Sequence, residues 1–351
     1  MGFRVMETLE FIGFLQLLTT VFIDGVAGID LTVLLCTHFI IICRKEDGRM
    51  SISLYNIKKW TRMLLGNSVL HVNQGVGKYF VKGEIKGYYN DLTEKVTRRP
   101  ELLEEGRLPI FQLESGETIH FATDVFQTGL GAYDMFLETG EDKYIKMFGR
   151  CVDWAVENQD SMGRWDSLSK IIPDEPFSAM IQGEGTSLLL RAYKHFGNQQ
   201  YFDAAKKSVD FMLLPIAEGG TSLYDGEDLF LAEYPKQPIV LNGWIFAMWG
   251  LYDLVLTDKD SRYAKLYNRT YKTMEKHLPR FSTSYWSKYC LGNRITSPFY
   301  HRLHIAQLTV LYELTGSEVF NEYVLKWKKW EKNPVYKIRA FCKKSFQKIM
   351  E

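Results

Sequence analysis

The protein has 351 residues, of which 46% are hydrophobic and 14% aromatic, enough apolar material for a large folded core. It carries 43 Lys and Arg against 42 Asp and Glu, so nothing in the overall charge indicates a nucleic-acid partner, and the composition excludes a disordered chain. The five cysteines are odd in number and contain no CxxC pair, which indicates free thiols instead of a disulfide framework or zinc site.

Two apolar runs, residues 11–23 and 31–43, mark the start of the chain. As helices of 13 residues each, they would be about 20 Å long, shorter than the roughly 30 Å of bilayer hydrocarbon. Three interpretations stay open for residues 1–49: a membrane anchor or hairpin, a signal-like leader interrupted by Asp30, and a dispensable segment before a working protein that begins near Met50. The localisation therefore stays open: the protein is either cytoplasmic or associated with a membrane, in the second case through residues 11–43.

Residues 50–118 are expected to form an N-terminal arm. Segments 79–81 and 85–89, rich in aromatic and β-branched residues, lie on either side of Lys82-Gly83-Glu84, a pattern that predicts a short β-hairpin. Residues 100–117 are polar and punctuated by Pro and Gly, so we expect a loop there that leads into the next domain.

A pattern with a period near sixty residues dominates residues 119–334. An apolar stretch that ends in a tyrosine is followed each time by a polar break and a second aromatic residue. The four tyrosines are Tyr133, Tyr193, Tyr252 and Tyr312, and the second aromatics are Tyr144, Tyr201, Tyr263 and Phe320. Such self-similarity indicates a repeated helix–turn–helix unit, and we interpret its aromatics as core residues.

The two helices of each unit differ in polarity. The first is apolar nearly all round and should lie inside, whereas the second carries charge on one face and should lie outside. The sequence therefore predicts an all-α fold in which residues 119–334 form an (α/α) toroid or barrel of repeated helix pairs. The short N-terminal β-hairpin arm would pack on this barrel, and residues 335–351 would form a basic C-terminal tail.

Ionisable and phenolic groups lie beside the buried helices at two places. Glu233 and Tyr234 precede Pro235, which ends any helix before it and holds them on a loop. In a toroid, such a loop lies at the mouth where the inner helices begin. A glutamate there is either a solvated loop acid or a general base whose pKa is raised by burial.

The second place is the start of the last inner helix. Tyr300 and His304 are four residues apart and share a helical face, as do His301 and His304. A histidine hydrogen-bonded at the edge of the core is the simpler interpretation, because no acidic residue lies nearby in sequence to complete a zinc site. We expect no metal and no cofactor. Trp165, after the turn at 158–164, is either an exposed platform for a sugar or a packed core residue.

Several of these blocks together resemble a known family, the C-terminal domain of the D-glucuronyl C5-epimerases of heparan sulfate and heparosan synthesis. The resemblance covers residues 120–332 and implies an (α/α) barrel. The blocks that carry it are Gln127…Gly129-Leu130…Tyr133, Asp153-Trp154…Asn158-Gln159-Asp160, Ser178-Ala179-Met180…Gln182-Gly183, Tyr234-Pro235…Asn242-Gly243, Gly250…Leu254 and Tyr300-His301…His304-Ile305…Gln307-Leu308.

The resemblance implies an isomerase that converts D-glucuronate to L-iduronate residues in a polysaccharide by removing and returning the proton at C5. It implies Glu233 and Tyr300 as the acid/base pair, with the two roles unassigned, and Tyr234 as an assisting catalytic group. It also implies a set of substrate-binding residues, in which Lys288 neutralises the sugar carboxylate: Tyr285, Lys288, His301, His304, Asn242 and Gln182.

The chain also departs from the family pattern. Lys288 stands where an arginine is expected, and a lysine cannot make the bidentate contact of an arginine with a carboxylate. Only 21 residues separate Tyr133 from Trp154, whereas animal members carry a large β domain there. Exact substrate and sulfation preference are therefore open, as are a bound calcium ion and a homodimer.

The alternatives to an epimerase are a uronic-acid polysaccharide lyase, an unsaturated glucuronyl hydrolase that uses Asp124 or Asp134, and a non-catalytic glycan-binding toroid. In each case, the expected partner is a uronate-containing polysaccharide and not a nucleic acid.

Overall fold

The computed structural model describes residues 71–350 apart from residue 167. Contacts divide the chain after Ser68 into two units, and the described residues all belong to the second unit, Val69–Glu351. The expectations for residues 1–49, and for a working protein that begins near Met50, lie outside the described residues. Within the described part, no helix combines the length and the apolar character needed to span a membrane.

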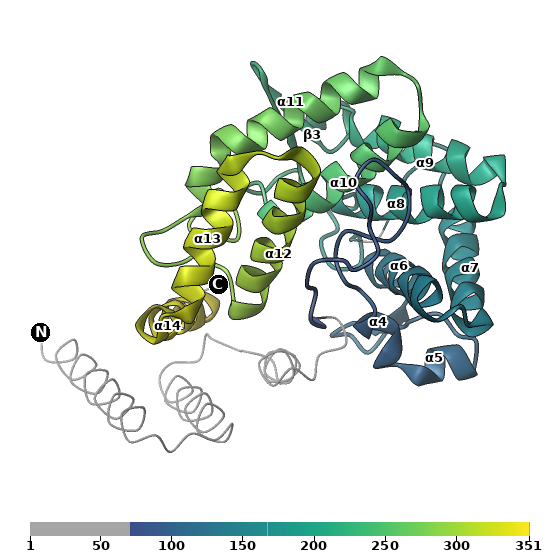
Figure 1. The fold of residues 1–351 in the computed structure, drawn as a ribbon, viewed down its shortest axis with the longest axis horizontal. Coiled ribbons are helices and arrows are strands. Elements are labelled where there is room, and N and C mark those ends of the chain that lie inside the picture. Colours follow the sequence, from purple (N-terminus) through teal and green to yellow (C-terminus); the bar gives the residue numbers. More distant parts are fainter. Residues whose placement is uncertain (1–70, 167, 351) are drawn as a thin grey trace, which may run out of the picture. The chain divides into compact units, whose positions relative to one another are not determined.

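Four helix pairs make up most of this unit, as the repeat predicts. The first helices are α6 (Ala122–Thr139), α8 (Ala179–Phe196), α10 (Leu241–Thr257) and α12 (Pro298–Thr315), and the second helices are α7 (Asp142–Glu157), α9 (Gln199–Met212), α11 (Ser261–His277) and α13 (Glu318–Lys332). Each first helix packs on its second helix, and the first helices contact one another in the order α6, α8, α10, α12. The pairs thus follow one another around an arc (Figure 1), and the predicted α/α fold is confirmed.

The inner helices pack closely against one another because they are apolar and carry glycine where two backbones meet. On α10, every residue from Leu241 to Leu251 is buried. A Cβ added at Gly250 would lie only 2.5 Å from the Cα of Gly183 on α8, so glycine lets these two backbones touch. The repeated tyrosines lie on the inner helices. Tyr133 is buried and packs on Phe148 of α7 with ring centroids 4.7 Å apart, as expected for a core residue, whereas Tyr193, Tyr252 and Tyr312 are only partly buried.

The turn within a pair is built on glycine in three of the four repeats. Gly140, Gly197 and Gly316 follow α6, α8 and α12 with φ of 70°, 71° and 75°, a left-handed conformation that glycine adopts without a steric penalty. The third pair differs, because Asp258, the residue after α10, has an extended conformation.

The N-terminal arm is an antiparallel loop, as predicted, but it is held by isolated pairs instead of continuous strands. Val76 pairs with Asn90, and Val81 pairs with Glu84. The arm leads into α4 (Glu94–Thr97).

The prediction of a loop at residues 100–117 is wrong in part. This stretch contains α5 (Pro100–Glu104) and the strand β1 (Phe111–Gln112), which pairs with β2 (Thr118–Ile119). The proline that suggested a break instead occupies the first position of a helix, where its missing N–H costs nothing.

The arm is fixed to the barrel by a buried ion pair. Arg191 of α8 donates to Asp253 of α10 at 2.7 Å and to the carbonyl of Gly87 at 2.9 Å. The Tyr89 hydroxyl donates to the same aspartate at 2.6 Å. A second buried cluster joins Lys95 and Arg99 to Asp124 of α6, at 3.2 and 2.8 Å. We call these the arm clamps.

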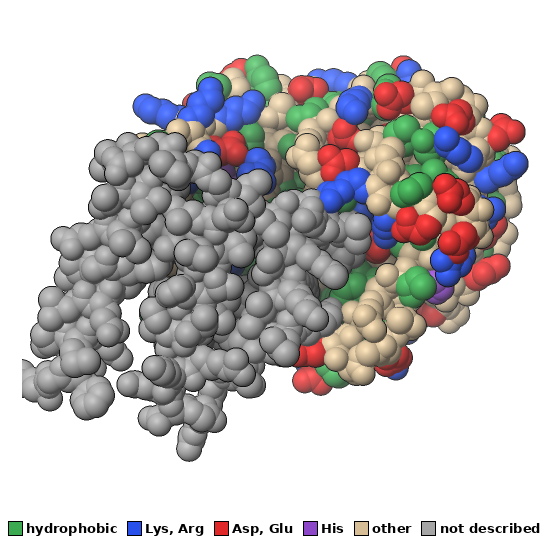
Figure 2. Space-filling view, turned by 90° about the horizontal axis from the view of Figure 1, so that it is seen from below, with side chains coloured by type: hydrophobic (Ala, Val, Ile, Leu, Met, Phe, Trp, Pro, Cys, Tyr) green, Lys and Arg blue, Asp and Glu red, His purple; other side chains and the backbone are tan. Residues whose placement is uncertain are grey.

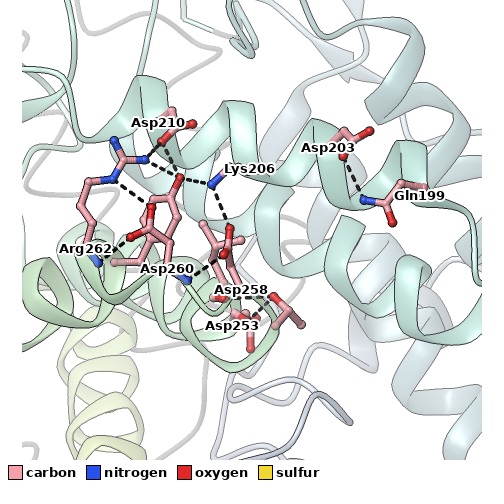
Figure 3. A network of polar contacts seen from close by, with 11 residues as sticks. Gln199, Asp203, Lys206, Asp210, Asp253, Asp258, Asp260 and Arg262 are labelled. Carbon is pink, nitrogen blue, oxygen red and sulfur yellow. Dashed lines mark hydrogen bonds and ion pairs between the residues drawn. The ribbon is translucent and has the colours of Figure 1, made fainter.

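The outer helices α9 and α11 are joined at the surface by a further polar network (Figure 3). Lys206 donates to Asp258 at 2.9 Å and to the Tyr263 hydroxyl at 2.6 Å, and this hydroxyl donates to Asp210 at 2.6 Å. Figure 2 shows acidic and basic side chains interspersed on the visible part of one face, in keeping with the balanced composition.

Two further elements complete the unit. A hairpin of β3 (Ser222–Asp225) and β4 (Asp228–Leu231) lies between α9 and α10, with Ser222 opposite Leu231 and Asp225 opposite Asp228. The short helix η1 (Ile216–Glu218) precedes this hairpin, and the short helix η2 (Leu278–Phe281) follows α11. The basic tail is helical: α14 (Pro334–Met350) follows α13 directly.

Candidate active site

Glu233 lies at the end of the unit where the inner helices begin, which we call the mouth. It follows β4, and the preceding residue, Ala232, accepts a hydrogen bond from Ala179 N at the start of α8, at 3.0 Å. The loop after it is held by the buried Glu175, which accepts from Lys236 N at 2.7 Å and from Gln237 Nε2 at 3.1 Å. The hairpin and this loop therefore fix the position of the glutamate.

The Glu233 side chain is buried against the first turn of α10. Its exposure is only 7%, and a Cβ at Gly243 would lie 2.7 Å from the Cβ of Glu233 and overlap its carboxylate. Glycine at this position is what allows the carboxylate to pack there. Of the two expected settings for this acid, solvated on a loop or buried, the structure shows the buried one.

Burial raises the pKa of Glu233 from its ordinary value to about 7, and interaction with the neighbouring Tyr234 phenol opposes this shift. The physical cause is desolvation, which disfavours the charged form. Among the described residues, none donates a hydrogen bond to Oε2 of Glu233. A carboxylate of this kind is ionised in an appreciable fraction near neutral pH and can accept a proton.

Three phenols share the surroundings of this carboxylate: Tyr234, Tyr289 and Tyr300. Burial and the negative charge of Glu233 raise the pKa of Tyr289 and Tyr300, and the charge of Glu233 and burial raise the pKa of Tyr234. The phenols also affect one another, since Tyr300 raises the pKa of both Tyr234 and Tyr289. All three are therefore protonated at neutral pH, and each can donate a proton or a hydrogen bond.

Tyr300 is placed by the first turn of α12. Pro298 opens the helix, and the Ser297 hydroxyl accepts from Tyr300 N at 3.4 Å. The ring is half-buried and lies edge-on to Tyr289, with centroids 5.1 Å apart. His71 approaches it from the start of the described chain, with ring centroids 6.1 Å apart. The structure therefore brings together Glu233, Tyr234 and Tyr300, the three residues for which the resemblance implies catalytic roles.

His301 and His304 have surroundings that differ from those of the phenols. His301 contacts the Ser287 hydroxyl at 2.7 Å and stacks on Trp286 at 3.7 Å, which is the hydrogen-bonded core histidine of the simpler interpretation. His304 is fully buried, with no hydrogen-bond partner for either ring nitrogen among the described residues. Burial lowers the pKa of both to about 3, so both are neutral. In residues 71–350, no group of three or more His, Cys, Asp or Glu is placed to hold a metal ion.

The other expected binding residues lie near the mouth in different settings. Asn242 is in the first turn of α10, and its carbonyl accepts from Gln307 Nε2 at 3.3 Å. Gln182 on α8 accepts from the Ser208 hydroxyl at 2.9 Å. Lys288 is half-buried in the loop before α12, where its backbone pairs with Ile295. Their roles toward a substrate stay predictions.

Tyr285 faces α14. Its ring lies 4.0 Å from the Arg339 guanidinium carbon and 6.2 Å from the ring of Tyr336. Its role toward a substrate stays a prediction. Sequence reasoning did not single out Tyr289, four residues later, which lies beside Tyr300. No local pattern distinguishes the two, because the segment between α11 and α12 is irregular and its side-chain directions depend on tertiary contacts.

Sequence reasoning also missed a second buried acid on α8. Glu184 is fully buried and accepts from Gln127 Nε2 at 2.7 Å. Burial raises its pKa to about 8, and the charge of Glu233 contributes to this shift.

Trp165 is a packed core residue and not an exposed platform: it is 1% exposed, and its Nε1 donates to the carbonyl of Ala155 at 2.8 Å.

The two aspartates considered for a hydrolase have different surroundings. Asp124 lies in an arm clamp, and its two cations hold its pKa below the ordinary value despite burial. Asp134 is buried, accepts from Tyr88 N at 3.0 Å, and has a pKa raised to about 8 by desolvation. Asp124 is therefore an anion in a structural cluster.

Comparisons with known proteins point to one family. Residues 159–329 match the model of the D-glucuronyl C5-epimerase C-terminus. A D-glucuronyl C5-epimerase of Caenorhabditis elegans is 27% identical over 215 residues, 53% of this chain and 35% of the relative. An uncharacterised protein of Methanocaldococcus jannaschii is 29% identical over 157 residues, 43% of this chain and 51% of that protein. The chain thus spans between a third and about half of the length of these curated relatives.

A solved structure whose title names UGL and dGlcA-Glc-Rha-Glc covers 81% of this chain and 82% of its own, with a TM-score of 0.43 and 12% sequence identity. The family match includes Glu233, Tyr234 and Tyr300 and extends from the turn before Trp165 through most of α13. Over residues 159–329, the chain is therefore similar to the family of D-glucuronyl C5-epimerase C-terminal domains.

Proposed function

We propose that this protein is a polysaccharide uronate C5-epimerase that converts D-glucuronate to L-iduronate residues. The observation that carries the proposal is the pairing of a buried carboxylate, Glu233, with a protonated phenol, Tyr300, at the mouth of the barrel. The family match over residues 159–329 supports it.

The reaction requires a base and an acid on opposite faces of one carbon. The C5 hydrogen of glucuronate is α to a carboxylate and only weakly acidic. In the proposed mechanism, Glu233 takes this proton, and the electron pair of the C–H bond moves into the carboxyl group to form an enediolate. Tyr300 then gives its phenolic proton to the other face of C5, which inverts the centre. Transfer of a proton from Glu233 back to the Tyr300 phenolate, through solvent, restores both groups.

The pKa values favour this assignment of roles over its reverse. A base works well when its pKa lies near the operating pH, and the pKa of Glu233 is about 7. The pKa of Tyr300 is raised above its ordinary value by burial and by the charge of Glu233, so its phenol stays protonated and serves as the donor. Tyr234 would assist by hydrogen bonding to Glu233 or to the sugar, and Lys288 would offset charge on the sugar carboxylate.

The test is hydrogen–deuterium exchange at C5 of a glucuronate polymer. Purified full-length protein would be incubated with heparosan in D₂O, and the polymer read by NMR. We expect deuterium at C5 together with new iduronate signals, and no signal from the variant Glu233→Gln. Chain cleavage with an unsaturated product would mean that the same base serves a lyase. No exchange in heparosan or its N-sulfated form would contradict the proposal and favour a glycan-binding role.

A further inference from the structure

We propose that Tyr289 is a substrate-contacting residue of this site, whose hydroxyl donates a hydrogen bond to the uronate carboxylate as that group gains negative charge. This inference deepens the proposed function and rests on it. It assigns a role to a phenol that neither the sequence patterns nor the family resemblance singled out.

The first support is position. The Tyr289 ring lies edge-on to Tyr300, with centroids 5.1 Å apart and planes at 69°. Burial, the negative charge of Glu233 and the neighbouring Tyr300 and Tyr234 phenols raise the pKa of Tyr289, in keeping with a position near the proposed base and acid. A sugar ring held between Glu233 and Tyr300 would therefore have Tyr289 beside it.

The second support is rigidity. The carbonyl of Tyr289 accepts from Leu241 N at the start of α10 at 3.1 Å, and its own N–H donates to the Arg294 carbonyl at 2.8 Å. The next residues continue this contact, because Cys290 pairs with Val240 and Leu291 N donates to the Ile239 carbonyl at 2.9 Å. The backbone of Tyr289 is thus tied to the helix start on which Glu233 packs, as a preorganised donor requires.

The third support is the state of the hydroxyl. No hydrogen bond among the described residues engages the Tyr289 hydroxyl, and its ring is half-buried. Burial and the neighbouring negative charge raise its pKa well above the ordinary value, so it is a neutral donor. The Nζ of Lys344 lies 5.9 Å from its ring centroid, which adds positive charge on this side of the site.

The chemistry explains why a third phenol is useful here. Glu233 removes the C5 proton and Tyr300 supplies one, so neither is free to stabilise the enediolate while protons move. A donor aimed at the developing charge is worth more in the transition state than in the ground state. Removal of such a donor is expected to lower kcat and leave KM nearly unchanged.

The test compares Tyr289→Phe with wild type and with Tyr336→Phe, a matched removal of a half-buried phenol on α14. We expect Tyr289→Phe to lower kcat for C5 exchange on the order of 100-fold, with KM changed by less than about threefold. The deuterium isotope effect for substrate labelled at C5 should rise, because proton transfer becomes more fully rate-limiting. Tyr336→Phe should match wild type. Circular dichroism and thermal melting would check that both variants fold.

Two results would overturn the role of Tyr289: a kcat for Tyr289→Phe within about threefold of wild type, or a loss confined to KM with an unchanged isotope effect. If wild-type protein catalyses no exchange, the proposed function fails, and the role of Tyr289 in the reaction, which rests on it, fails with it.

Discussion

The arm clamps and the mouth of the barrel both bury ionisable side chains, but only the clamps neutralise them. Arg191 and Asp253 are fully buried and hydrogen-bonded to each other at 2.7 Å, and Asp124 lies between Lys95 and Arg99. At the mouth, Glu233 is surrounded by phenols, and burial moves its pKa toward neutrality.

The difference shows how one fold uses buried charge in two ways. A buried ion with a matched partner resists titration and holds two segments together, and its loss leaves the partner uncompensated. A buried acid without a cation changes its protonation state easily and is a candidate for chemistry. Glu184 lies between these cases, since an amide from Gln127 satisfies one oxygen while burial raises its pKa to about 8.

The largest effect is expected from Glu233→Gln, which removes the proposed base and keeps its shape. The rate of C5 exchange should fall by about 10²–10⁴-fold, the usual contribution of general acid–base catalysis, while the melting temperature should not fall. Exchange by NMR and calorimetry would measure the two. Full activity of the variant, or inactivity caused by loss of the fold, would contradict the claim that Glu233 serves catalysis whereas the arm clamps serve stability.

The reverse pattern is expected from Asp253→Ala in the arm clamp. It leaves Arg191 buried without its counter-ion, and the free energy of unfolding should fall by about 3–5 kcal/mol. The control is Lys143→Ala, which breaks a solvent-exposed pair with Glu141 and should leave the free energy of unfolding nearly unchanged. Denaturant titration measures both, and equal small losses would show that the clamp does not hold the arm.

Gly243→Ala tests the positioning of Glu233. The added methyl group overlaps the Glu233 carboxylate and should displace it, so that C5 exchange falls on the order of 10²-fold. Gly149→Ala on α7, where a Cβ meets nothing within 4 Å, is the control and should keep full activity. Unchanged activity of Gly243→Ala would mean that the carboxylate does not act from the position described.

The effect expected from Glu184→Gln appears as a pH dependence of stability. The pKa of Glu184 is raised to about 8 in the folded protein from an ordinary 4.5, so its contribution is fully present below pH 4.5 and is lost as pH rises toward 8. That loss is at most about 1.4 kcal/mol per pH unit in this window. The variant should therefore gain stability relative to wild type between pH 5 and pH 8.5. Parallel stability–pH curves for the two proteins would contradict the buried, uncompensated state of this acid.

The repeat in the sequence was enough to predict the fold because each helix pair follows from a local pattern of residues. The spacing of Tyr133, Tyr193, Tyr252 and Tyr312 predicted the inner helices α6, α8, α10 and α12, where they are found. Pro235 likewise predicted a loop at Glu233. The hairpin of β3 and β4 was not predicted, because its strands are short and end in a two-residue turn at Gly226 and Glu227.

The contacts that define the two regions could not be predicted, because they join residues far apart in the chain. Arg191 and Asp253 are 62 residues apart, and Arg191 lies in a mostly apolar stretch. Glu184 and Gln127 are 57 residues apart. The contact of Tyr289 with Tyr300 depends on side-chain direction in an irregular segment, and the burial of Trp165 depends on the space left by Gly185.

The central claim is that a buried, uncompensated carboxylate at the mouth removes the C5 proton. It is tested most directly by the rate of deuterium incorporation at C5 of heparosan from pH 5 to pH 9. Because Glu233 must be ionised to act as the base, kcat/KM should rise with pH through a midpoint near 7 and level off while Tyr300 stays protonated. A rate independent of pH over this range, or a midpoint near the ordinary glutamate value, would contradict this role of Glu233.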